Sequence, residues 1–160
     1  MKALDLHPDF RALLDERKRT MTLFTPDHRP VVMVAIYRTD LEMPAEKLAA
    51  QAGHAFDELG HRMNSETAAW YRGTGHGTKL LFHVKNLGQL QRAYAEAKEA
   101  GFPVVAVCDR NHILPPHFDG EPVITAIGIG PVYKDEVRAI TKRCSMYRAP
   151  ATASTLEAAA

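Results

Sequence analysis

The apolar residues of this chain alternate between two patterns, short continuous runs and the three-to-four-residue repeat of a helix. The apolar runs predict buried strands over 31–37, 79–85, 103–108 and 123–129. Helical spacing, with Pro44 suited to a first turn and Gly101 to a C-terminal stop, predicts helices over 5–20, 44–63, 64–72, 87–100 and 134–144. Alternating strands and helices indicate a single α/β domain whose four-stranded sheet carries helices on both faces.

The connection between the third and fourth strands carries a polar loop over 110–121 and no helical pattern. A parallel pair of strands normally needs a dozen or more residues with a helix between them. We therefore expect one antiparallel strand in a mixed, mostly parallel sheet. The same patterns divide the chain into an N-terminal helical extension at 1–30, the α/β domain at 31–148 and a low-complexity tail at 149–160, which we expect to be disordered.

Composition narrows the class of protein. A length of 160 residues suits one domain, and 46% hydrophobic with 24% charged residues supplies an ordinary core. No apolar run reaches the roughly 18 residues of a membrane span, and charges interrupt the start of the chain, so we expect a cytoplasmic protein. Cys108 lies in an apolar run and is expected to be a buried free thiol. The net charge of +1 is no signature of a nucleic-acid-binding protein, although local patches matter more than the total.

The helix expected over 44–63 separates an apolar face from a polar stripe. Lys47, Gln51 and His54 fall on the stripe, because residues three and four positions apart are neighbours on a helix. Periodicity alone favours a solvent-exposed polar face for them. Gly53 costs the helix about 1 kcal/mol relative to alanine, which indicates a packing or functional reason for it. The apolar face is expected to be buried against a sheet that contains Val34 and Ile36, and its residues are Leu48, Ala52, Ala55, Phe56 and Leu59.

The letters K-L-A-A-Q-A-G-H-A at 47–55 resemble the K-x-A-A-Q-x-x-H-A signature of the type 2 peptidyl-tRNA hydrolases. Further segments occur in the family's order over about residues 31–142. They are V-M-V-A-I-Y-R-T-D at 32–40, a strand that begins with Lys79, a strand that ends in Asp109, and T-A-I-G-I-G-P at 125–131. The resemblance implies a hydrolase of the ester that joins a peptide to tRNA, with tRNA as its partner, a homodimer as its assembly, and neither a metal nor another cofactor.

Four side chains are candidate catalytic residues under this hypothesis. Lys47 would place a positive charge at a phosphate or at the developing oxyanion, and Asp109 would orient Lys47 or position a water molecule. His54 suits proton transfer near neutral pH, and the hydroxyl of Thr125 would hold water or substrate. Each has a plain alternative: a surface histidine for His54, a loop cap for Asp109 and an ordinary strand residue for Thr125.

Three further residues are candidates for substrate binding. Gln51 can donate or accept a hydrogen bond without titrating. Lys79 would contact the RNA backbone, and the small side of the helix at Gly53 would allow a ligand to approach closely.

One segment departs from the family's pattern. After the third strand the family has aspartate, a small residue, glycine, any residue and threonine, whereas this chain reads D-R-N-H-I at 109–113. The aspartate is kept, and the glycine and threonine are absent. Two alternatives therefore stay open: a non-catalytic relative that binds RNA or protein, and a hydrolase of a small ester or amide.

Two other segments contain residues typical of binding sites. The spacing of Cys108, Asp109, His112 and His117 matches no familiar zinc site, so no metal site is predicted. The glycines of 73–77 form no phosphate-binding loop, and we expect a mobile loop there.

Overall fold

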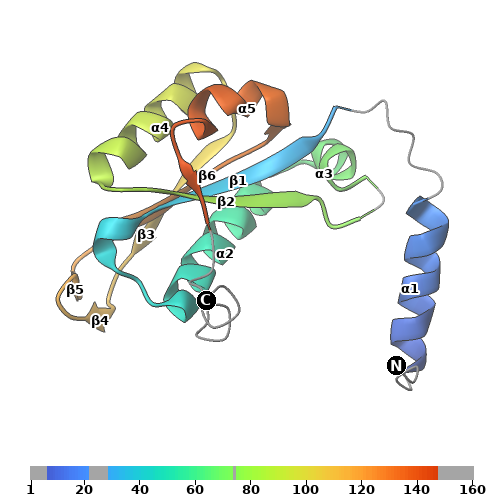
Figure 1. Cartoon of the computed structure of the whole chain (residues 1–160), viewed down its shortest axis with the longest axis horizontal. Helices are drawn as coiled ribbons and strands as arrows, with labels where there is room; N and C mark the ends of the chain where they lie inside the picture. Colours follow the sequence, from blue (N-terminus) through green and yellow to red (C-terminus); the bar gives the residue numbers. More distant parts are fainter. Residues whose placement is uncertain (1–6, 22–28, 74, 148–160) are drawn as a thin grey trace, which may run out of the picture.

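A five-stranded sheet lies at the centre of the part of the chain that the computed structural model describes, residues 7–21, 29–73 and 75–147. The strands are β1 (Val31–Arg38), β2 (Thr78–Val84), β3 (Val104–Asp109), β6 (Val123–Tyr133) and β7 (Ser145–Met146). They lie in the order β3-β6-β1-β2-β7 (Figure 1). Every strand predicted from the sequence is present, and β7 is an addition.

The pairing of the strands differs from the prediction. Only β1 and β2 are parallel, whereas β6 runs antiparallel to both of its neighbours and β7 runs antiparallel to β2. The prediction of a four-stranded, mostly parallel sheet was therefore wrong in the number of strands and in their pairing. One antiparallel strand was expected, but its position was not: β6 lies between β1 and β3, so these two strands, which run in the same direction, are not neighbours. A two-residue strand such as β7 is too short to leave a periodic pattern.

Helices cover both faces of the sheet, as predicted (Figure 1). On one face lie α2 (Ala45–Arg62) and α3 (Ser65–Arg72), whose buried side chains meet β1, β3 and β6. On the other face lie α4 (Leu87–Glu99) and α5 (Lys134–Thr141). A short 3-10 helix, η1 (Thr39–Leu41), connects the end of β1 to α2.

Successive side chains of β1 point to opposite faces of the sheet and enter different parts of the core. Val32, Val34 and Ile36 pack with α4 and α5, whereas Met33 and Ala35 pack with α2 and its neighbours. The predicted apolar face of α2 is buried, with Phe56 half-buried. The prediction that this face packs against the sheet containing Val34 and Ile36 is confirmed; the β1 side chains that face it are Met33 and Ala35, which a continuously apolar strand does not reveal.

β3 is the outermost strand on one side of the sheet, and this position corrects the prediction for Cys108. Val105 and Val107 are buried toward α2, whereas Ala106 and Cys108 are exposed on the other side. Cys108 is therefore an exposed thiol, not a buried one. The loop predicted after β3 also contains a small hairpin, β4 (Ile113–Leu114) with β5 (Phe118–Asp119).

The ends of the chain hold one described helix, α1 (Pro8–Met21), within the predicted N-terminal extension. It lies apart from the sheet in Figure 1, and its largest apolar side chains, Phe10, Leu13 and Leu14, are exposed. The predicted tail at 149–160 lies outside the described residues. No helix in the described ranges is long and apolar enough to cross a membrane.

Candidate functional site

The structure brings Lys47 and Asp109 together at the edge of the sheet where β1, β2 and β3 end. Lys47 is the third residue of α2, and Asp109 is the last residue of β3. The Lys47 Nζ donates to Asp109 Oδ2 at 2.5 Å, and the two side chains are 9% and 16% exposed. This ion pair is thus largely shielded from water, which strengthens its field at any group that reaches it.

Phe118 of β5 covers the ion pair. Its side chain is 2% exposed, and Lys47 Nζ lies 4.3 Å from the centre of its ring. Attraction between the ammonium and the ring face adds to the hold on Lys47. The His112 ring packs edge-on against Phe118 at 5.9 Å. Sequence reasoning missed Phe118; the available signal was one large aromatic side chain in an otherwise polar loop.

Gln51 and Thr125 form a buried link between α2 and β6. Thr125 is 0% exposed and Gln51 4% exposed, and the Thr125 hydroxyl lies 2.6 Å from Gln51 Oε1, to which it donates. The periodicity-based expectation of an exposed Gln51 was therefore wrong. Its carbonyl oxygen is occupied, whereas its amide nitrogen makes no hydrogen bond to any described residue. Thr125 positions Gln51, and the Gln51 amide is the donor left for another group.

His54 and Gly53 lie farther along α2, on its exposed side. Seven residues separate His54 from Lys47, which corresponds to about 10 Å along a helix. A Cβ added at Gly53 would meet no heavy atom within 4 Å, so no neighbour in the protein requires a glycine there. The predicted stripe thus contains two largely buried side chains, Lys47 and Gln51, and one exposed side chain, His54.

Lys79 lies at the opposite edge of the sheet. It is the second residue of β2, and the strand register places it about seven residues from the level of Asp109, roughly 20 Å along the strands. Its Nζ donates to the backbone oxygen of His76 at 3.0 Å. The structure therefore does not bring Lys79 to the Lys47–Asp109 pair. Gly77, in the loop predicted to be mobile, packs on the buried ring of Tyr71 at this far edge.

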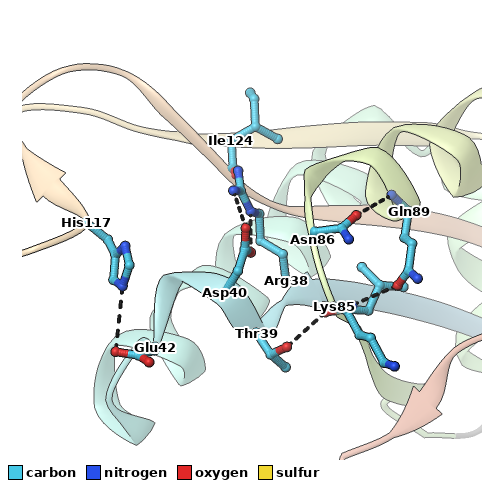
Figure 2. A network of polar contacts seen from close by, with 10 residues as sticks. Arg38, Thr39, Asp40, Glu42, Lys85, Asn86, Gln89, His117 and Ile124 are labelled. Carbon is cyan, nitrogen blue, oxygen red and sulfur yellow. Dashed lines mark hydrogen bonds and ion pairs between the residues drawn. The ribbon is translucent and has the colours of Figure 1, made fainter.

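The R-x-D segment after β1 fixes the backbone beside the site (Figure 2). Arg38 donates to both carboxylate oxygens of Asp40, at 2.8 and 2.7 Å, and to the backbone oxygen of Ile124. The Arg38 hydrogen bonds hold the pKa of the Asp40 carboxyl below its usual value. Glu42 reaches His117 of the hairpin loop at 3.6 Å. These contacts connect η1 to β6 and to the hairpin that carries Phe118.

The described residues contain no group of three or more histidine, cysteine or acidic side chains placed to hold a metal ion. The chemistry available at the site is therefore that of a shielded lysine–carboxylate pair with an amide donor nearby. Such an arrangement can stabilise a negative charge that develops on an oxygen atom.

Comparison with known proteins gives a consistent result. The model of the family described as peptidyl-tRNA hydrolase PTH2 matches residues 31–147. A peptidyl-tRNA hydrolase of Sulfurisphaera tokodaii is 34% identical over 117 residues, with 68% of this chain and 92% of the relative covered. One of Methanothermobacter thermautotrophicus is 34% identical over 109 residues, with the same coverage. One of Sulfolobus acidocaldarius is 31% identical over 118 residues, with 68% and 93% covered.

Proposed function

Because the chain belongs to the peptidyl-tRNA hydrolase family PTH2, we propose that it cleaves the ester between a peptide and tRNA at the Lys47–Asp109 pair. The observation that carries this proposal is the ion pair itself, at 2.5 Å and largely shielded beneath Phe118. A lysine tied down in this way is held in one place before the substrate arrives. That preorganisation is what electrostatic catalysis requires.

The reaction is the addition of water to the ester carbonyl carbon. The carbonyl oxygen gains negative charge, the bond from carbon to the ribose oxygen breaks, and the ribose regains its hydroxyl while the peptide leaves as a carboxylate. Lys47 stabilises the negative charge on the carbonyl oxygen. Asp109 holds Lys47 in position and keeps its charge directed at the site.

The remaining candidates take supporting roles. The free amide nitrogen of Gln51 donates a hydrogen bond to the substrate, and Thr125 fixes that amide through its oxygen. His54 is exposed on α2 about 10 Å along the helix from Lys47, so its proposed role is to position the substrate beside the helix. The open surface at Gly53 gives the substrate room beside the helix. The predicted homodimer stays a prediction, to be checked from the molar mass of the protein in solution.

The decisive variants are Lys47→Met and Asp109→Asn, because each removes one charge and keeps the length of the side chain. Loss of a charge that acts on the oxyanion costs on the order of 3 kcal/mol, or about a hundredfold in kcat. Turnover of a model peptidyl-tRNA is measured beside the melting temperature. Lys98→Met is the matched control, because Lys98 is an exposed lysine on α4. It should retain full turnover.

A double variant separates catalysis from stability. Lys47→Met leaves a shielded Asp109 carboxylate without a partner, so the melting temperature should fall. Adding Asp109→Asn removes the unpaired charge and should restore part of the melting temperature without restoring turnover. Normal turnover by Lys47→Met would eliminate this site. Tight binding of peptidyl-tRNA by the unaltered protein, with no turnover, would favour the non-catalytic alternative that the missing glycine and threonine leave open.

A further inference from the structure

A polar cleft lies between α4, α5 and the end of β2, on the face of the sheet away from Lys47. Its volume is about 190 Å³, and its polar lining consists of Gln89, Arg92, Arg143 and Cys144. Pockets for drug-sized organic ligands usually begin near 300 Å³, so this cleft suits a small anion. We propose that it binds a phosphate of the tRNA backbone, an inference that rests on the proposed function.

The lining supplies donors for a phosphate. Gln89 Oε1 already accepts from the Lys85 backbone N–H at 2.8 Å, which leaves the Gln89 amide nitrogen to donate (Figure 2). Arg143 is held in place by its ion pair with Glu96. The guanidinium of Arg92 has no hydrogen-bond or ionic partner in the described part of the chain. A guanidinium matches two phosphate oxygens at once, so Arg92 is the principal contact.

The position of the cleft relates it to the ester. It lies where β2 ends, and the Lys47–Asp109 pair lies where β3 ends, at the same edge of the sheet. Three strand spacings separate β2 from β3 in the sheet order, which is about 14 Å within the plane of the sheet, and the cleft and the ion pair lie on opposite faces of it. A stacked nucleic acid strand covers that in-plane length in about four nucleotides at 3.4 Å each, and the passage from one face to the other requires further nucleotides. An RNA strand that places its terminal ester at Lys47 therefore needs more than about four nucleotides, running past the ends of the strands, to bring a phosphate to the cleft.

The charges along this edge favour such a path. The Asp40 carboxylate is neutralised by Arg38, and Glu42 faces His117 (Figure 2). Glu96 is matched by Arg143. Lys85, exposed beside Gln89, has no side-chain partner among the described residues, so Lys85 and Arg92 are available to RNA beside the cleft, as is the exposed Arg110 beside Asp109. Neither Lys79 nor its surroundings reach this edge.

The test measures the Kd of the full chain for deacylated tRNA, which carries no amino acid or peptide, at several salt concentrations. Arg92→Glu should raise the Kd at least about tenfold and reduce the slope of log Kd against log salt by about one, because a phosphate contact is lost. Lys98→Glu makes the same charge change on the same helix, outside the cleft, and should bind like the unaltered protein. Arg92→Gln, a milder change, should weaken binding less than Arg92→Glu. Melting temperatures verify that each variant is folded.

Hydrolysis of peptidyl-tRNA gives an independent readout. Arg92→Glu should raise KM and leave kcat unchanged, as expected for a contact made equally in the ground and transition states. Equal Kd and KM for Arg92→Glu and Lys98→Glu, in a protein that hydrolyses normally, would overturn the cleft and leave the proposed function intact. If tRNA binding depends on Arg92 and the protein hydrolyses no peptidyl-tRNA, the cleft is supported and the proposed function is overturned. A third outcome is that inorganic phosphate raises the melting temperature of the unaltered protein and not that of Arg92→Glu, while both proteins bind tRNA equally. The cleft would then be a site for a free anion, and the proposal would be overturned.

Discussion

At the scale of single residues, Gly53 is the least explained feature of the site helix. It lies in the interior of α2, and an added Cβ would find open space. Gly53→Ala should therefore stabilise the protein by about 1 kcal/mol through helix propensity alone. If substrate lies against this surface, as proposed, the same methyl group should raise KM for peptidyl-tRNA several-fold. Thermal unfolding and steady-state kinetics measure the two effects separately.

Gly60 provides the control for this prediction. It is also inside α2, and a Cβ there would just touch the Met63 side chain at 4.0 Å. Gly60→Ala should raise the melting temperature in the same way without changing KM. An unchanged KM in both variants would mean that Gly53 does not face the substrate.

Single residues also mark how far the sequence could be interpreted. Lys47 and Asp109 were identifiable because both stand in recognisable segments, one in a helix signature and one at a strand end. Their 2.5 Å contact was anticipated only as one of two roles for Asp109. Gln51 was expected at the surface, because helical periodicity does not detect a polar side chain that is buried against a threonine of a distant strand. Phe118 escaped prediction because its contact with Lys47 depends on how a hairpin folds back.

At the scale of secondary structure elements, the junction of α3 and β2 depends on Gly77. Its φ is +75°, and a Cβ there would lie 2.3 Å from the buried Tyr71 ring. Gly77→Ala should therefore destabilise the fold by at least about 3 kcal/mol, the sum of left-handed strain and a forced displacement of the ring. Gly101 has a nearly identical φ of +76° and nothing within 4 Å. Gly101→Ala should cost only the strain, about 1 kcal/mol. Urea unfolding of both variants compares the two costs, and equal losses would contradict the packing argument.

Elements differ in how well the sequence predicts them. Those with an internal period, such as α2 and α4, were predicted to within two residues at each end. The place of β6 in the sheet was not, because strand order depends on contacts between distant segments. Gly128 shows how closely β6 packs under α2. A Cβ there would lie 3.0 Å from the Ala55 backbone oxygen, so α2 packs directly against a bare stretch of β6. A glycine in an apolar run carries no hint of which helix will cover it.

At the scale of the whole molecule, arginine–carboxylate contacts lie at both ends of the central strand β1. Before the strand, Arg29 contacts Asp135 and Glu136 at the start of α5. After it, Arg38 holds Asp40 and the Ile124 backbone. The first cluster is well exposed, with side chains 44–64% accessible, and such pairs contribute little in water. Arg38 is only 13% exposed, so the second contact should contribute more than the first to the response of the fold to acid.

The direction of that response follows from the pKa of Asp40, which its hydrogen bonds from Arg38 hold below the usual value of 3.8. A lowered carboxyl pKa stabilises the folded state above the unfolded value, and this contribution is lost as the pH falls through the folded value. Asp40→Asn should therefore lower the melting temperature at neutral pH, and its difference from the unaltered protein should shrink as the pH falls below about 4 and through the lowered folded pKa. Asp57→Asn is the control, because Asp57 is exposed on α2 and has no ionic partner among the described residues. It should match the unaltered protein at every pH. The melting-temperature difference between Asp40→Asn and the unaltered protein could also stay constant from neutral pH into acid. Asp40 would then contribute through its shape or through neutral hydrogen bonds, and the charge of its carboxylate would not stabilise the end of β1.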